Sequence, residues 1–178
     1  MPKLLVSRAR QVAERRAMEE TNRLARALRQ PMRMRTHRLR DINRLNAFLS
    51  GEHAAVQTYT QCIQRMKDPA VIGRLRKLRA SHAQRVKMLT QKIQELGGQP
   101  VSDSSLWTSF AKMVEGSAKL LSKSAAVSTL RTGERHGRLE YTRQLPQLSD
   151  DTRRFVLTSM LPQQVRTHDA LRALQREV

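Results

Sequence analysis

Four side chains of kinds that bind metal ions or exchange protons fall on the apolar faces of four different predicted helices. They are Glu52, His82, Glu134 and His168. Two carboxylates and two imidazoles are suitable ligands for one iron, manganese or zinc ion, and they also form hydrogen bonds with one another. A carboxylate left unpaired in an apolar core is costly. The four residues therefore predict either a metal site or an internal hydrogen-bond network inside the protein.

The buried position of Glu52 follows from the spacing of its helix. Apolar residues recur there in alternating steps of three and four, and Glu52 takes one of these places. Tyr59 and Tyr141 lie two turns after Glu52 and Glu134 on the same faces, so their hydroxyls are available for hydrogen bonds in the core. The full row is Ile42, Leu45, Leu49, Glu52, Val56, Tyr59, Ile63 and Met66.

Proline, glycine and capping residues divide the chain into helices. A helix expected from Lys3 to Arg29 ends at Pro31, and the first bundle helix covers 38–67. The pair Asp68-Pro69 separates it from a second helix over 69–96, which Gly97-Gly98 ends. A further helical segment is expected over 105–123 and a third bundle helix over 124–145. The last helix follows the cap residue Ser149 and is expected to kink at Pro162.

This order predicts an all-α fold. Two helical hairpins separated by about 28 residues form the pattern of a four-helix bundle with one long crossover between helices two and three. Residues 1–40 form a basic helical arm, and residues 41–178 form the bundle. The expected apolar row of the second helix is Leu75, Leu78, His82, Val86, Leu89, Ile93 and Leu96, and that of the last helix is Leu157, Leu161, Val165, His168, Leu171 and Leu174.

The levels of the four polar residues along the bundle decide which of them can meet. Measured from the turn at Asp68, Glu52 and His82 lie within about 3 Å of one level. The levels of Glu134 and His168 along the bundle differ by about 10 Å, so His168 is expected to be the member out of reach.

Di-metal bundles of the ferritin-like type use Glu-x-x-His pairs, but Arg79 and Val165 stand three residues before the two histidines. A metal-free network, one ion and two ions remain as alternatives, in that order of expectation.

The chain has a formal net charge of +19, which favours a polyanionic neighbour such as RNA, DNA or an anionic membrane surface. Residues 1–40 hold twelve Lys and Arg against three Glu, a net charge of +9. Arginine suits bidentate contacts with phosphate. The candidate polyanion-binding residues are Arg8, Arg10, Arg15, Arg16, Arg23, Arg26, Arg29, Arg33, Arg35, Arg38 and Arg40.

The remaining sequence signals bear on location. Cys62 is the single cysteine, which indicates a reducing compartment and leaves no intrachain disulfide. No apolar run reaches the length that spans a bilayer. The Arg-rich, amphipathic N-terminus is similar to mitochondrial transit peptides, so we expect a mitochondrial matrix location, with the bacterial cytoplasm as the alternative.

Several runs of sequence resemble an uncharacterised bacterial family of ferritin-like four-helix proteins of unknown function. They are SGEHAAVQTY (50–59), LGGQP (96–100), SSLWTSFAKMVEGSAKLL (104–121), GERHGRLEY (133–141) and LPQQVRTH (161–168). The resemblance covers about residues 42–174 and implies a ferritin-like bundle with Glu52, His82, Glu134 and His168 as candidate ligands. The family's pattern carries a second Glu where this chain has Gln57. It implies no established activity.

No phosphate-binding glycine loop, nucleophile elbow or Ser-His-Asp pattern is present in the sequence, and no catalytic residue is assigned. We expect a non-catalytic structural subunit, a ferritin-like bundle with a degenerate metal site, held by its arginines and by neighbouring subunits in a large ribonucleoprotein or organellar complex such as a mitochondrial ribosome. One alternative is a ferritin-like redox or storage protein that binds iron, manganese or zinc. The other is a subunit of a respiratory-type complex anchored at a membrane surface.

Overall fold

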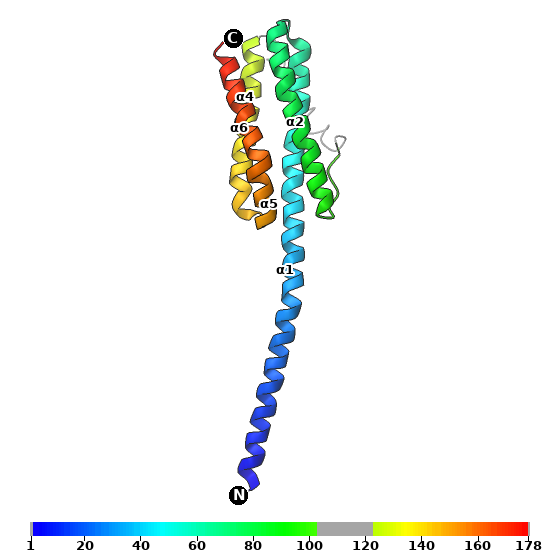
Figure 1. Cartoon of the computed structure of the whole chain (residues 1–178), viewed down its shortest axis with the longest axis vertical. Helices are drawn as coiled ribbons and strands as arrows, with labels where there is room; N and C mark the ends of the chain where they lie inside the picture. The colour runs from blue at the N-terminus through cyan, green and yellow to red at the C-terminus, as the bar shows by residue number, and fades with distance from the viewer. Residues whose placement is uncertain (1, 103–122, 178) are drawn as a thin grey trace. The chain divides into compact units, whose positions relative to one another are not determined.

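The computed structural model describes residues 2–102 and 123–177, and within these the side chains of 2–13, 28–32 and 123 are left undescribed. Its helices are α1 (Pro2–Arg65), α2 (Pro69–Glu95) and α4 (Lys123–Gln144). A 3₁₀ turn, η2 (Leu145–Gln147), precedes a last helix made of α5 (Asp150–Phe155), the π-helical turn η3 (Val156–Met160) and α6 (Leu161–Gln175). The fold class is all-α, with no strand in the described residues (Figure 1). The helical segment expected over 105–123 falls almost wholly outside them.

The chain divides into two compact units, residues 1–38 and 39–178. In the first unit the expectation that a helix ends at Pro31 is wrong, because the helical assignment of α1 continues through this residue. Proline removes one backbone hydrogen bond and crowds the preceding turn, but a long helix can accommodate both with a kink. The described side chains from 14 to 38 are exposed, apart from the partly exposed Ala25.

In the second unit, the end of α1 packs with α2, α4 and the last helix as a bundle (Figure 1). Side-chain contacts show that neighbouring helices run antiparallel, since positions that rise along one helix contact positions that fall along the next. Consequently α2 and α4 point the same way, as in a bundle with one long crossover. The contacts are Glu52–Arg85 and Thr60–Arg79, Glu52–Tyr141 and Tyr59–Glu134, Glu134–Gln164 and Arg131–Gln175, and Arg85–Gln164 and Arg74–Glu177.

The ends of α2 match the sequence signals. The Asp68 carboxylate accepts hydrogen bonds from the backbone N–H of Ala70 and Val71, at 3.0 and 3.3 Å, and Pro69 opens the helix. At the other end Gly97 takes a left-handed φ of 73°, and the N–H of Gly98 bonds to the Ile93 carbonyl at 2.9 Å. This arrangement is the glycine-dependent Schellman cap.

Two apolar clusters form the core of the bundle, and polar residues separate them. One cluster packs at the α1–α2 turn and the other at the opposite end of the bundle. Between the levels of these clusters, α1 carries Glu52 and α2 carries His82. The buried clusters are Tyr59, Cys62, Val71, Leu75, Leu78, Ala126, Val127, Leu130, Leu171 and Leu174, and Ile42, Leu45, Phe48, Leu49, Leu89, Ile93, Tyr141, Leu148, Val156 and Met160.

The first half of the last helix buries a different row from the one expected, whereas the expected positions His168, Leu171 and Leu174 are buried. Leu157 is 44% exposed and Val165 is half-buried, whereas Val156, Met160 and Gln164 are buried. Buried residues recur there every four positions through η3, because a π-helical turn holds more residues than an α-helical turn. This turn lies directly before Pro162, in place of a simple proline kink. The change of phase brings Gln164 and Thr167 into the core.

Asp41 fixes the start of this helix against α1. Its buried carboxylate accepts hydrogen bonds from the Ser149 backbone N–H at 3.1 Å, from the Ser149 hydroxyl, and from the Thr152 hydroxyl at 2.8 Å. Ser149 is the N-cap residue, as expected, but its own side chain makes no capping bond. Asp41 therefore joins two helices that are far apart in the sequence.

Candidate functional site

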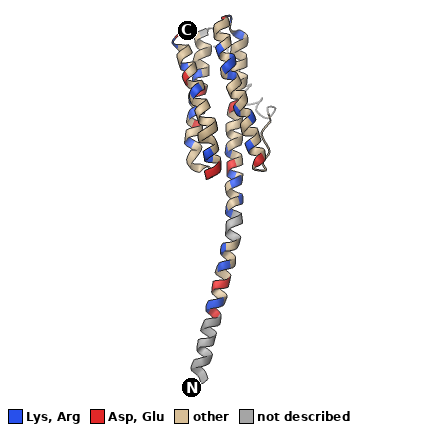
Figure 2. Ribbon diagram, viewed as in Figure 1, with Lys and Arg blue, Asp and Glu red and all other residues tan. Residues whose placement is uncertain are grey.

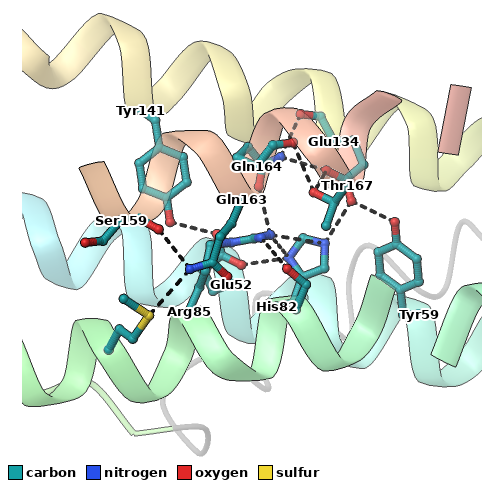
Figure 3. Close-up of polar contacts among 12 residues, drawn as sticks. Glu52, Tyr59, His82, Arg85, Glu134, Tyr141, Ser159, Gln163, Gln164 and Thr167 are labelled. Carbon is teal, nitrogen blue, oxygen red and sulfur yellow. Dashed lines mark hydrogen bonds and ion pairs between the residues drawn. The ribbon is translucent and has the colours of Figure 1, made fainter. Parts of the chain in front are cut away.

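Three of the four candidate residues meet inside the bundle. The His82 ring lies between two carboxylates, with Nδ1 2.7 Å from Glu52 Oε2 and Nε2 2.8 Å from Glu134 Oε1 (Figure 3). All three side chains are buried. The expected shared level of Glu52 and His82 is confirmed, and α4 adds Glu134 from the far side of the imidazole.

Arg85 is a member of this cluster that the sequence reading did not include. The expected row of α2 passed through Val86, but Arg85 is 0% exposed and Val86 is half-buried. Its Nε donates to Glu52 Oε1 at 2.8 Å, and its Nη2 donates to Gln164 Oε1 at 2.8 Å. The available signal was its position three residues after His82, which places both side chains on one helix face.

The proton positions on His82 follow from its neighbours. Arg85 Nη2 lies 2.7 Å from His82 Nδ1, and arginine cannot accept a hydrogen bond. That contact would need a lone pair on Nδ1, whereas the contact with Glu52 needs a proton there. Carboxylates at both ring nitrogens favour the doubly protonated ring. We therefore assign the Nδ1 proton to Glu52 and the Nε2 proton to Glu134.

The pKa directions agree with this assignment. Burial lowers the pKa of His82, but its hydrogen bonds to Glu134 and Glu52 and the charge of Glu52 outweigh burial, so the pKa lies above its ordinary value. Burial raises the pKa of Glu52 and Glu134, but the hydrogen bond and charge of His82 help bring both below the ordinary value. With Arg85 also charged, the cluster holds two negative and two positive groups and has no net charge.

Two tyrosines complete the cluster in a crossed arrangement. Tyr59 of α1 donates to Glu134 Oε1 of α4, and Tyr141 of α4 donates to Glu52 Oε1 of α1, both at 2.7 Å. Each tyrosine follows its own helix's glutamate by seven residues, so antiparallel packing places it beside the glutamate of the other helix. Burial, and then the charge of the neighbouring carboxylate, raise the pKa of both hydroxyls well above the ordinary value. The expected hydrogen-bonding role of the tyrosines is confirmed.

The last helix supplies Gln164 and Thr167. Gln164 Nε2 donates to Glu134 Oε2 at 2.7 Å, and the Thr167 hydroxyl donates to the same oxygen at 2.9 Å. A glycine makes room for the amide, since a Cβ built at Gly137 would lie 3.0 Å from Gln164 Nε2. All four helices therefore contribute to one network (Figure 3). The shifted row of the last helix is the reason that the sequence reading missed both residues.

His168 does not join the network in the described contacts. It is buried next to Thr167, and its Nδ1 has no hydrogen-bond partner in the structure. The expectation that it is the member out of reach agrees with this placement. Gln57, at the position where the resembling family carries a glutamate, is also outside the network and has a buried Oε1 without a partner.

The donor set does not fit a bound metal ion. Each carboxylate of Glu52 and Glu134 is already held by cationic or hydroxyl donors, and the guanidinium of Arg85 supplies positive charge where an ion would have to sit. In the described residues, no group of three or more His, Cys, Asp and Glu side chains is arranged as a metal site. Arg79, three residues before His82, donates to the Thr60 hydroxyl at 3.4 Å. The geometry is that of a self-contained network of ion pairs.

Cys62 lies outside this network, in the apolar cluster at the α1–α2 turn. Burial raises the pKa of its thiol to about 11. A protonated and fully buried thiol is a weak nucleophile, which is consistent with a packing role.

The candidate polyanion-binding arginines are exposed wherever their side chains are described. This holds for Arg15, Arg16, Arg23, Arg26, Arg33, Arg35, Arg38 and Arg40. The side chains of Arg8, Arg10 and Arg29 lie outside the described set. Figure 2 shows basic residues repeated along the described part of the arm, with few acidic residues between them.

Comparison with known protein families identifies the family of this chain. A family model described as "Domain of unknown function (DUF2383)" matches residues 40–147, which is more than half of the chain. The chain belongs to this family. The DUF2383 region covers α2, α4 and the end of α1, and so contributes Glu52, His82, Arg85 and Glu134 but not Gln164 or Thr167. Searches of curated proteins and of solved structures gave no match.

A membrane-spanning segment was also sought. Among the described residues, no helix combines the length and the apolar character needed to cross a bilayer.

Proposed function

We propose that this protein is a non-catalytic structural subunit of a large RNA-containing assembly, with the bundle as its folded body and the arginine-rich arm as its RNA contact. The observation that carries the proposal is the set of exposed arginines in the arm, where eight described side chains between 15 and 40 are exposed. Contacts between arginine and phosphate need neither a pocket nor an aromatic platform. The first aromatic residue of the chain is Phe48, after the arm.

The buried network supports a structural role for the bundle. Its charged groups compensate one another and are shielded from solvent. Its tyrosines donate to carboxylates inside the same network and therefore have their hydroxyl protons engaged. We regard it as a polar layer that fixes the register of four helices, in a ferritin-like bundle whose metal-binding role has been replaced by Arg85.

The N-terminal signal and the charge favour the mitochondrial matrix as the location, and an organellar ribosome or a comparable ribonucleoprotein as the assembly. The described side chains of the arm favour RNA over the membrane-surface alternative. A surface-bound helix needs a continuous apolar face. The large exposed apolar residues of the described arm are isolated along the helix, with exposed arginines between them, so they form no continuous apolar face. They are Met18, Leu24, Met34 and Leu39.

RNA binding by purified full-length protein tests the proposal. We expect affinity to fall steeply with salt, and to be largely lost when residues 1–40 are removed, because counterion release from phosphates supplies most of the binding free energy. Circular dichroism and thermal unfolding of the shortened chain provide the control for an intact bundle. RNA affinity that is indifferent to the deletion would refute the role of the arm.

Metal analysis of protein purified without chelator tests the other half of the proposal. We expect no stoichiometric iron, manganese or zinc. A stoichiometric transition metal that disappears in Glu52→Ala would show that the bundle is a metal protein instead.

A further inference from the structure

The arm carries one row of arginines along a single helix face. Arg15, Arg26 and Arg33 are separated by eleven and seven residues, and each step returns to the same face within about 20°. All three side chains are exposed. The position of Arg8 has nearly the same helical phase. The described part of this row extends over about 27 Å, with steps of about 16 and 10 Å.

The other described arginines of this unit lie on different faces. Arg16, Arg23 and Arg38 are about 70° or more around the helix from the centre of the row. Glu14 and Glu20 are also turned away, and Glu19 lies at the edge of the row. The charge in the row is therefore arranged in a line, in addition to being abundant.

We infer that this row binds the phosphate backbone of double-stranded RNA, an inference that rests on the proposed function. A row of cations on one helix face matches a polyanion whose phosphates follow a stiff and regular path, which a duplex provides. Single-strand binding uses aromatic side chains on which bases stack, and residues 1–47 contain no aromatic residue. Backbone contacts carry no sequence information, so the binding is independent of base sequence.

The test uses the full chain with three probes: a short RNA duplex of mixed sequence, one strand of that duplex alone, and vesicles rich in phosphatidylserine. The row variant Arg15→Gln/Arg26→Gln/Arg33→Gln is compared with the matched variant Arg16→Gln/Arg23→Gln/Arg38→Gln. Both variants lose the same charge from exposed positions of the same unit. Circular dichroism checks that both keep the helical content of the parent.

We expect the parent to bind the duplex at least about tenfold more tightly than the strand, and the row variant to lower the salt slope of duplex binding by about one per arginine. The matched variant should lower it by clearly less. An equal decrease of the salt slope in the two variants, or equal affinity for duplex and strand, would refute duplex binding by the row. Either result would leave the proposal that the arm binds RNA intact. Binding to vesicles with no binding to either RNA would overturn the proposed function as well.

Discussion

The ion pair between Glu52 and Arg85 is enclosed by the bundle and shares its carboxylate with His82 and Tyr141. Burial lowers the pKa of Arg85, but the charge and hydrogen bond of Glu52 outweigh burial and raise it above the ordinary value. A buried ion pair of this kind adds little stability compared with apolar packing, but removal of one partner leaves the other charge buried and unpaired. The main effect of the ion pair is therefore on the specificity of the fold, because one arrangement of the helices gives every polar group of the network its hydrogen-bond partner.

Replacement of Arg85 by Met should lower the free energy of unfolding by about 3–5 kcal/mol, because Glu52 keeps the His82 imidazolium but loses its guanidinium partner in a buried site. Arg74→Met is the matched control, since the Arg74–Glu177 pair is about half exposed, with side-chain exposures of 51% and 53%. That control should cost much less, because solvent screens an exposed ion pair. Urea denaturation measures both, and equal costs for the two variants would contradict the described burial of Arg85.

The pH dependence of stability should have two limbs. Because the folded pKa of His82 is raised above 6.5, its contribution is complete below about pH 6.5 and is lost as pH rises through the folded pKa. Because the folded pKa values of Glu52 and Glu134 are lowered below 4.5, their contribution is complete above about pH 4.5 and is lost as pH falls through the folded values.

The network's contribution is therefore greatest between about pH 4.5 and 6.5. Thermal or urea unfolding over a pH series measures it, with His82→Gln as the comparison. The difference in unfolding free energy between the parent and the variant should become smaller as the pH rises. A difference that stays constant from pH 6 to pH 10, or rises, would mean that His82 is neutral in the folded protein at about neutral pH.

Part of this site was predictable from residue types. Glu52, His82 and Glu134 were identified because polar residues interrupted apolar rows, and the tyrosines because they followed the glutamates by two turns. Arg85 was missed because an arginine beside a valine is normally assigned to solvent, and its burial depends on partners from two other helices, Glu52 of α1 and Gln164 of α6. Contacts of this kind arise from tertiary packing, which no single helix's periodicity contains.

At the scale of elements, capping residues defined the helix ends well. The turn at Asp68 and the glycine cap at Gly97 were both predictable, because their conformations are local. The continuation of α1 through Pro31 and the π-helical turn η3 were not predictable. In each case a locally unfavourable backbone conformation is tolerated because the rest of the helix stabilises it. The phase change at η3 also moved the buried row of the last helix onto Gln164.

Two glycines of α4 provide a test of how closely α4 and α6 pack. Gly137→Ala should lower the free energy of unfolding by about 1–3 kcal/mol, because the new Cβ displaces the Gln164 amide, 3.0 Å away, from Glu134. Gly133→Ala is the control, since a Cβ there would meet nothing within 4 Å, and should raise stability by about 0.5–1 kcal/mol.

Thermal unfolding of the two glycine variants measures this contrast. A stabilising effect at both positions would show that Gln164 does not approach α4 as described. Destabilisation at Gly133 instead would indicate a contact on the exposed side of α4.

At the scale of the whole molecule, two apolar clusters form the core of the bundle, a neutral polar layer between them selects one arrangement of its helices, and most of the remaining charge belongs to exposed arginines. The net charge of +19 was evident from the sequence and is far from compensated by the 15 acidic residues, of which Asp41, Glu52 and Glu134 are buried. The sequence also predicts the kind of partner, a polyanion, and this stays a prediction. It could not supply the identity of the assembly, which depends on surfaces of other molecules.

The state of the native protein tests the central claim most directly. A gentle extract is fractionated by sedimentation, with and without ribonuclease, and the chain is followed with an antibody. We expect the 20.5 kDa chain to migrate with large RNA-containing particles and to move to light fractions after ribonuclease or high salt. Migration as a small species in both samples would contradict a structural role in a ribonucleoprotein.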